Sequence, residues 1–287
     1  MSQPLVSIVI PVYNGMPYLV DCVGSALAQT YPEIEVVVIE NHSDDGSAEW
    51  LRTQDDPRLR VVYRESTQPA PENWTQAVQE STGRFVKLMC ADDLIRKDTI
   101  AIQVADLIAH PEAVMAASRR RIIDPQGKSM KDKHGLPSMS GVIDGLAALR
   151  ACCLTGTNPF GEPAAVMFDG DRIRSVMPWR SQWPYMIDVA TYAELLRDGA
   201  VVCDQAVLAS FRVTATSWSS TLLSQQPIQF RAWRDDMIAS GVVRFSSIDR
   251  LRSDLSIRGR ALGRKAYFWQ VARAGKRRSS ATPPATA

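Results

Sequence analysis

The chain has 287 residues, of which 45% are hydrophobic, with 16 glycines and 17 prolines, so fibrous and disordered classes are excluded and one or two folded domains are expected. No run approaches the roughly 18 apolar residues of a membrane-spanning helix, and the first residues lack the basic start and cleavage site of a signal peptide. We therefore expect a cytoplasmic globular protein.

The charge distribution and the cysteines further limit the kinds of protein that this sequence can encode. The net charge of +2 conceals an asymmetry, because from Leu223 onward 13 Lys and Arg stand against four Asp, which gives this end +9 and the preceding part −7. The five cysteines are odd in number and contain no CxxC pair, which fits neither a disulfide framework nor a zinc site. We expect buried thiols, with Cys22 and Cys90 as small core residues.

Residues 5–27 have the pattern of a strand followed by a helix. Residues 5–10, LVSIVI, are largely β-branched, which is typical of a strand buried on both faces of a parallel sheet. The loop PVYN follows. Apolar residues then recur at helical spacing from Leu19 to Leu27, with Pro17 near the first turn.

The same unit recurs through the first half of the chain. Strands are expected at 35–39, 60–64, 84–89 and 113–118, with helices near 50–51, 74–81 and 104–108. This alternation predicts an α/β fold with a mostly parallel, doubly wound sheet. Because such sheets bind ligands at the carboxyl ends of their strands, we expect the polar loops after these strands to share one edge.

The pattern beyond Arg119 is less regular. A polar stretch from there to Lys133 predicts a surface hairpin or loop. Strands are expected at 164–168 and 207–211, and a helix is expected to open at Asp188 between them.

Residues 223–287 contain no obvious strand and are expected to form a basic helical extension. Basic and aromatic residues mix between 255 and 271, and the final residues 279–287 are low-complexity and expected to be disordered. Three interpretations of this tail stay open. It packs on the preceding domain as a charged helix, it docks to an anionic membrane surface, or it binds nucleic acid, which the lack of a recognised module disfavours.

No glycine-rich phosphate loop follows any expected strand. Both GxGxxG after the first strand and GxxxxGK[ST] are missing, so a bound diphosphate needs another counter-charge. Asp92 and Asp93 supply one indirectly, because adjacent carboxylates at a strand end can hold a divalent cation that takes phosphate oxygens. The alternative is that one of them caps the next helix.

The first 120 residues resemble the family 2 glycosyltransferases of the GT-A fold. The resemblance rests on motifs in the family's order and spacing: Val6 to Asn14, Gln29-Thr30-Tyr31, Glu35 to Glu40 with the loop 41–47, Asn73, Gly83 and Cys90 to Asp93. It implies residues 1–120 as a nucleotide-sugar-binding half and 121–222 as an acceptor-side half of one domain, 1–222.

The resemblance also implies roles for residues at the strand ends. Pro11, Val12 and Tyr13 would line the nucleobase pocket, Glu40 would read the base or ribose, and Asn73 would join the donor site. Asp93, with Asp92 beside it, would hold Mn²⁺ or Mg²⁺. Two departures are present, since Glu40 replaces the usual Asp and Cys90 stands where many members carry the first Asp.

The second half resembles the acceptor-side motifs of a bacterial branch of the family. The matching residues are Gly161-Glu162-Pro163, Asp188 before Leu195-Leu196, and Arg212-Val213 with Ser217. The resemblance implies Asp188 as the general base, which an inverting transfer needs to take the proton of the acceptor hydroxyl. A helix N-cap is the alternative for Asp188, and Glu162 is the second choice for the base.

The diphosphate needs a cation in this second half. Many relatives have a His two residues after the Arg, where this chain has Thr214. A neutral hydroxyl carries no charge, so Arg212, or Arg119 to Arg121, would have to compensate. Arg212 in a structural salt bridge is the competing interpretation.

Taken together, the sequence predicts an inverting, metal-dependent hexosyl- or deoxyhexosyltransferase that moves a sugar from a nucleotide-diphosphate donor to a glycan or lipid-linked acceptor. The resemblance implies polysaccharide biosynthesis for the cell envelope, in the cytoplasm or at the inner face of the membrane, without nucleic acid. Two alternatives remain: an inactive nucleotide-sugar-binding module and a sugar-phosphate nucleotidyltransferase, although the latter should carry a basic Gly-rich loop after the first strand.

Overall fold

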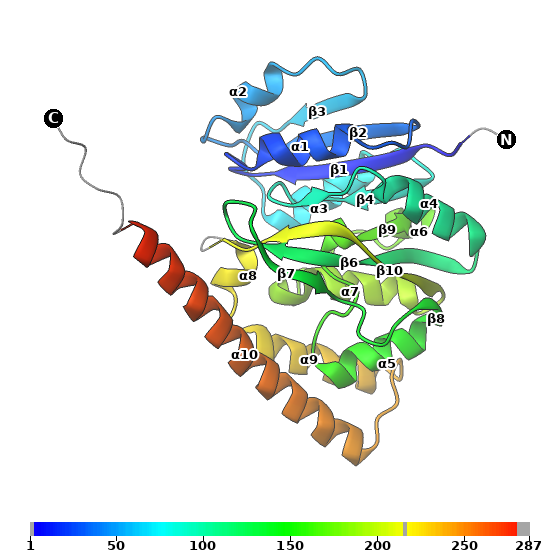
Figure 1. Cartoon of the computed structure of the whole chain (residues 1–287). Coiled ribbons are helices and arrows are strands. Elements are labelled where there is room, and N and C mark those ends of the chain that lie inside the picture. The colour runs from blue at the N-terminus through cyan, green and yellow to red at the C-terminus, as the bar shows by residue number, and fades with distance from the viewer. Residues whose placement is uncertain (1–2, 215–216, 280–287) are drawn as a thin grey trace.

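Strand β1 (Val6–Val12) lies inside the sheet, between β2 and β4, and every one of its residues is buried. The computed structural model describes residues 3–214 and 217–279, and its ten strands form one sheet in the order β3-β2-β1-β4-β9-β6-β10-β5 (Figure 1). β7 pairs with β6, and β8 pairs with β10. The remaining strands are β2 (Ile34–Glu40), β3 (Leu59–Tyr63), β4 (Phe85–Leu88), β5 (Leu94–Ile95), β6 (Ala113–Ile123), β7 (Ser129–His134), β8 (Gly141–Asp144), β9 (Val166–Asp169) and β10 (Ala200–Arg212).

Most strands run in one direction, as the sequence predicts. β1 is parallel to β2 and β4, β2 is parallel to β3, and β6 is parallel to β10. The exception at the centre is β9, which is antiparallel to both of its neighbours, β4 and β6. The segment before β9, rather than the one after it, therefore reaches the edge where the parallel strands end.

Helices cover both faces of the sheet, and residues of β2 alternate between them. Val36 and Val38 pack with Leu19 and Val104, from the helices on one face, whereas Val37 packs with residues on the other. The first face carries α1 (Leu19–Leu27), α2 (Ser47–Arg52) and α4 (Thr99–Ala109). The second carries α3 (Ala70–Gln79), α5 (Gly145–Thr155) and α7 (Ile187–Leu196).

Several short elements were not expected from the sequence. They are β5, β8, α5, α6 (Gly170–Ser175) and two 3₁₀ turns, η1 (Pro163–Ala165) and η2 (Pro184–Met186). β8 has three exposed residues out of four, so it carries no apolar alternation. The predicted hairpin after Arg119 is confirmed as β6 and β7, which pair antiparallel. β10 begins seven residues before the predicted start, at Ala200.

Three helices follow the sheet: α8 (Trp218–Thr221), α9 (Gln226–Ala239) and α10 (Ser247–Ser279). α10 is anchored on α5, because Ile257 is fully buried and Ser253 Oγ donates to the carbonyl of Cys153 at 2.7 Å. Among the described helices, none combines the length and the apolar character needed to cross a bilayer. The disorder predicted for 279–287 concerns residues that, from 280 on, lie outside the described part of the chain.

Candidate active site

At the carboxyl edge of the sheet, backbone N–H groups of the loop after β1 donate three hydrogen bonds to side chains of the loop after β2. The N–H of Asn14 donates to Ser43 Oγ at 3.0 Å, that of Gly15 to Ser47 Oγ at 3.0 Å, and that of Met16 to Asp45 Oδ2 at 2.7 Å. The loop after β1 is thus held by the loop after β2. Ser47 and Asp45 had no predicted role, although both lie in the polar run that follows β2.

The residues predicted to bind the base lie in or next to these loops. Pro11 and Val12 are buried at the end of β1, and Tyr13 is 55% exposed in the loop. Glu40 is buried at the end of β2, where its carboxylate accepts the N–H groups of His42 at 3.2 Å and Ser43 at 2.8 Å. Glu40 therefore fixes the conformation of its own loop, and its role toward a base stays a prediction.

Cys90, Asp92 and Asp93 form a compact cluster after β4. The thiol sulfur and one oxygen from each carboxylate lie within 4.8 Å of one another. Asp93 is fully buried; its Oδ1 accepts the N–H of Arg212 at 3.0 Å, and its Oδ2 has no hydrogen-bond partner among the described residues. The capping interpretation of this pair is wrong, because β5 follows directly and the N-cap of α4 is Asp98.

Burial and mutual repulsion disfavour the ionised forms of all three side chains in this cluster. Burial, and then the charge of Asp92, raise the pKa of Asp93 well above its usual range, and burial raises the pKa of Asp92. Burial and the two carboxylates also raise the pKa of the Cys90 thiol. Two crowded carboxylates with an unpartnered buried oxygen fit a divalent cation, whose charge would relieve the repulsion. Cys90, expected as a core residue, is a half-buried member of this donor set.

Asp188 lies on the first turn of α7 and is partly buried. Asn158 Nδ2 donates to its Oδ2 at 2.8 Å, and the N-cap of α7 is Met186, so Asp188 is not the cap residue. Burial raises the pKa of Asp188 to about 6, and the charge of Glu162 adds to this rise. A carboxylate with such a pKa is ionised at neutral pH and still basic enough to accept a proton.

One partly buried ion pair acts electrostatically on both Asp93 and Asp188. Arg120 from β6 pairs with Glu162, with Nη2 donating to Oε1 at 3.0 Å. The charge of Glu162 raises the pKa values of both Asp93 and Asp188, and that of Arg120 lowers both. These residues therefore share one electrostatic neighbourhood. The carboxylate of Glu162 is already paired with Arg120, which makes it a weaker candidate for a base than Asp188.

Arg212 closes the cluster from the end of β10. Its Nε donates to the carbonyl of Asp92 at 2.9 Å, and Nη1 donates to the carbonyls of Asp124 at 3.3 Å and Pro125 at 3.1 Å. The guanidinium lies 4.5 Å from the ring centroid of Tyr18. The predicted carboxylate salt bridge is not formed among the described residues, and contact with a diphosphate stays a prediction.

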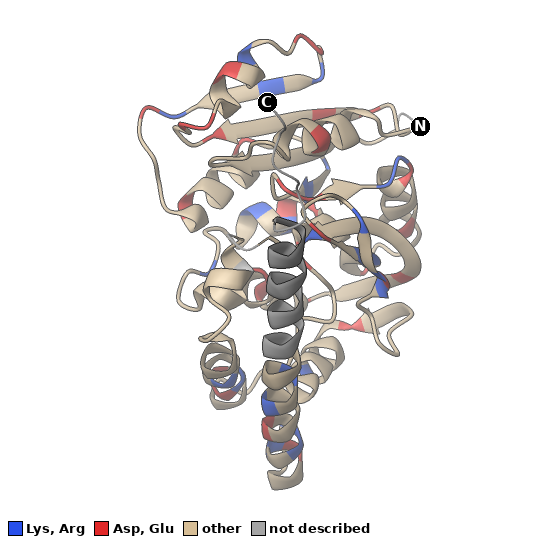
Figure 2. Cartoon of the chain, turned by 60° about the vertical axis from the view of Figure 1, so that its left-hand side comes forward, with Lys and Arg blue, Asp and Glu red and all other residues tan. Residues whose placement is uncertain are grey.

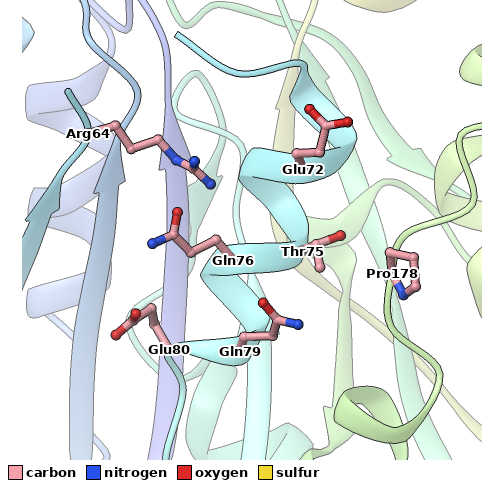
Figure 3. Close-up of a pocket in the computed structure, with 7 residues that line it drawn as sticks. All are labelled: Arg64, Glu72, Thr75, Gln76, Gln79, Glu80 and Pro178. Carbon is pink, nitrogen blue, oxygen red and sulfur yellow. The ribbon is translucent and has the colours of Figure 1, made fainter. Parts of the chain in front are cut away.

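Helix α3 carries Asn73 and also borders a cavity. Asn73 is buried, and its Oδ1 has no hydrogen-bond partner in the part of the chain that the structure describes. A cavity of about 440 Å³ lies beside the same helix (Figure 3), lined by Arg64, Glu72, Thr75, Gln76, Gln79, Glu80 and Pro178. The lining contains none of the carboxylate-cluster residues, so this cavity is separate from the cluster.

Comparison with protein families and sequences relates the chain to sugar transferases. The profile of glycosyl transferase family 2 matches residues 7–168. A Bacillus subtilis protein named as a teichuronic acid biosynthesis glycosyltransferase, TuaG, is 25% identical over 221 residues, which are 76% of this chain and 82% of TuaG. The chondroitin synthase of Pasteurella multocida is 27% identical over 139 residues, covering 48% of this chain and 14% of that protein.

Solved structures show the same fold at low sequence identity. S. aureus TarS 1–349 in complex with UDP-GlcNAc has a TM-score of 0.64 and 15% identity, covering 88% of this chain and 70% of that chain. The mannosyltransferase PcManGT from Pyrobaculum calidifontis, in complex with GDP-Man and Mn²⁺, has a TM-score of 0.62 and 17% identity, covering 99% and 77%.

Proposed function

The chain belongs to glycosyl transferase family 2 and has the GT-A fold, and we propose that it moves a hexosyl or deoxyhexosyl group from a nucleotide-diphosphate donor to an acceptor hydroxyl with inversion at the sugar carbon. The observation that carries this proposal is the Arg120–Glu162 pair, which couples the Asp92–Asp93 cluster to Asp188. A site for the leaving diphosphate and a base for the nucleophile would then lie in one neighbourhood.

Asp93 and Asp92, with Cys90, would hold a divalent cation. Such a cation supplies charge compensation for the departing diphosphate when it is bound. Two carboxylates suit Mn²⁺ or Mg²⁺, whereas the thiolate is a softer ligand that favours Mn²⁺ over Mg²⁺. The unpartnered Oδ2 of Asp93 supports this assignment.

The donor would bind along the two joined loops. Pro11, Val12 and Tyr13 would contact the base, and Glu40 and Asn73 would complete the nucleoside site. Arg212, held beside Asp92, would place its positive charge near the diphosphate. TarS was solved with UDP-GlcNAc and PcManGT with GDP-Man, which supports a nucleotide-sugar donor here.

Asp188 would act as the general base. Its carboxylate would take the proton of the acceptor hydroxyl as the oxygen forms a bond to the sugar carbon and the bond to the diphosphate breaks on the opposite side. Asn158 holds one carboxylate oxygen, which fixes the orientation of the side chain. Glu162, paired with Arg120, would raise the basicity of Asp188 through its charge.

The acceptor would be a hydroxyl of a glycan or of a lipid-linked acceptor. The names of TuaG and of chondroitin synthase refer to polysaccharides, which supports polysaccharide biosynthesis, and we propose the cell envelope as its destination. Work at the inner face of the cytoplasmic membrane fits a lipid-linked acceptor.

A nucleotide panel followed by turnover tests the proposal. Stabilisation of the protein by UDP, GDP or dTDP that strengthens with Mn²⁺, together with sugar transfer or donor hydrolysis, would support it. Asp188→Asn should lose turnover and keep nucleotide binding, while Asp198→Asn, an exposed carboxylate ten residues further along, should keep both. Binding without turnover across a wide acceptor panel would favour an inactive module. Formation of a nucleotide sugar from a nucleoside triphosphate would favour a nucleotidyltransferase.

A further inference from the structure

α10 carries an apolar stripe that no described part of the protein covers. Ile248, Leu251, Leu255 and Leu262 are 63%, 61%, 60% and 69% exposed. With 3.6 residues per turn these four side chains fall on one side of the helix, about 170° from the side that carries buried Ser253 and Ile257. Since that opposite side is anchored on α5, the stripe has to face outward, and Figure 2 shows the described part of α10 along the outside of the molecule.

The charges around the stripe have one sign. Arg252 lies beside it and Arg258 interrupts it between Leu255 and Leu262, and neither arginine makes an ion pair among the described residues. The aspartates of the same stretch lie elsewhere on the helix: Asp249 pairs with Arg150 at 3.0 Å and Asp254 with Arg234 at 2.8 Å. The two aspartates are therefore paired with arginines of other elements, whereas the arginines at the stripe have no acidic partner among the described residues.

A second copy of the chain fits this face poorly. The apolar positions have the heptad spacing of a coiled-coil seam, but Arg258 occupies one of the seam positions between Leu255 and Leu262. A two-fold pairing would bury this arginine among leucines or bring the like charges of Arg252 and Arg258 from two copies together.

We propose that the outward face of α10 binds an anionic lipid bilayer. The leucines and isoleucine would enter the boundary between headgroups and acyl chains, and Arg252 and Arg258 would reach the lipid phosphates alongside them. α10 begins below α5 and α9 and rises toward the side of the molecule at which β10 ends (Figure 1), so a membrane lying along this helix would extend toward the active-site edge. Only this last consequence, access to a lipid-linked acceptor, rests on the proposed function.

Vesicle sedimentation of the full chain tests the proposal without turnover. Phosphatidylcholine vesicles containing phosphatidylglycerol should bind the protein, pure phosphatidylcholine vesicles should bind it weakly, and added salt should release it. Leu251→Glu/Leu255→Glu should weaken binding at least about tenfold, and Arg252→Gln/Arg258→Gln about tenfold or more. The matched control, Val20→Glu/Ile108→Glu, changes two exposed aliphatic residues on α1 and α4 by the same charge and should bind like the wild type.

Circular dichroism and light scattering on the same proteins complete the test. Both α10 variants should keep the wild-type spectrum and oligomeric state. Failure of the wild type to bind the mixed vesicles, or equal binding by wild type and both folded α10 variants, would overturn the proposal. A wild-type dimer that dissociates in Leu251→Glu/Leu255→Glu and shows no vesicle binding would assign the stripe to a second copy instead.

Discussion

The N–H of Arg212 donates to Oδ1 of Asp93 at 3.0 Å, which joins the end of β10 to the carboxylates that follow β4. The side chain of the same arginine holds the carbonyls of Asp92, Asp124 and Pro125. Arg212 thus links three loops of the sheet edge, and its charge lies beside the predicted diphosphate site.

Arg212→Lys should separate these two contributions. Lysine keeps the positive charge but lacks the planar fork that reaches three carbonyls, so the free energy of unfolding should fall by about 1 to 3 kcal/mol. Nucleotide affinity in the presence of Mn²⁺ should fall less than in Arg212→Gln, which also loses the charge. Urea denaturation and calorimetry measure the two effects, and Arg96→Gln, in an exposed pair with Asp98, serves as the control. Equal stability of Arg212→Lys and wild type would contradict a stabilising role for the hydrogen bonds from the Arg212 side chain to the three carbonyls.

The rate of transfer should rise with pH through about 6, the pKa of Asp188, and then level off. The base works only when it is ionised, so Asp188→Asn should lower kcat by about 10²- to 10⁴-fold at every pH and remove this limb of the profile. A profile of kcat against pH for the wild type, with Asp198→Asn as control, checks the expectation. Retained activity in Asp188→Asn would exclude this residue as the base.

The same carboxylate should make the protein less stable as pH rises. The pKa of Asp188 is about 6 in the folded state against a usual 3.8, so the folded state binds more protons between these values and the free energy of unfolding falls across this window. Asp188→Asn should lack this fall and be more stable than the wild type at pH 7 by on the order of 1 to 3 kcal/mol. Urea denaturation at several pH values measures the difference, and a destabilised variant would show that the hydrogen bond from Asn158 dominates.

Lys87 should give a stability change of the opposite sign. It is fully buried on β4, its Nζ donates to Gln103 Oε1 at 2.9 Å and the carbonyl of Val166 at 3.0 Å, and burial lowers its pKa to about 7. The unfolded chain keeps this proton up to about 10.5, so stability gains between pH 7 and that value. The stability of the wild type minus that of Lys87→Met should therefore grow by a few kcal/mol over this range. A constant difference would mean that Lys87 stays charged.

Cys90 should tune the choice of cation. Replacing the thiol by a carboxylate in Cys90→Asp should raise the affinity for Mg²⁺ relative to Mn²⁺, because Mg²⁺ prefers oxygen ligands. Thermal stabilisation by UDP or GDP with each metal measures the ratio, and Asp93→Asn should abolish the metal-dependent part. An unchanged ratio in Cys90→Asp would place the thiol outside the metal site. Cys203→Ser, a buried thiol on β10, controls for loss of a sulfur.

The sequence predicted the strands with β-branched runs and the helices with one apolar face, because both patterns follow from local geometry. It did not predict the direction of β9, since a short apolar run reads the same in either direction. β8 was missed because its pairing with β10 depends on backbone hydrogen bonds rather than on apolar side chains.

In the candidate site, too, some residues could be predicted from local sequence motifs and others could not. Motif positions alone named Asp92, Asp93 and Asp188 as candidates, and the structure places them after a strand or in the first turn of a helix, while their roles stay predictions. Arg120 was named only as a possible counter-charge, and Asn158 received no role. Their partners, Glu162 and Asp188, are 42 and 30 residues away along the chain, so only the folded arrangement identifies them.

The reversed direction of β9 has a consequence for how such a protein can change. The loops after β1, β2 and β4 leave the sheet edge after their strands, whereas the chain carrying Asn158 and Glu162 arrives before β9. Under the proposed function, the donor and the acceptor would therefore be recognised by separate segments of the chain. One segment could then be replaced without altering the other. Replacing residues 124–162 with the corresponding stretch of a relative should alter which hydroxyl is glycosylated while the nucleotide preference is inherited unchanged.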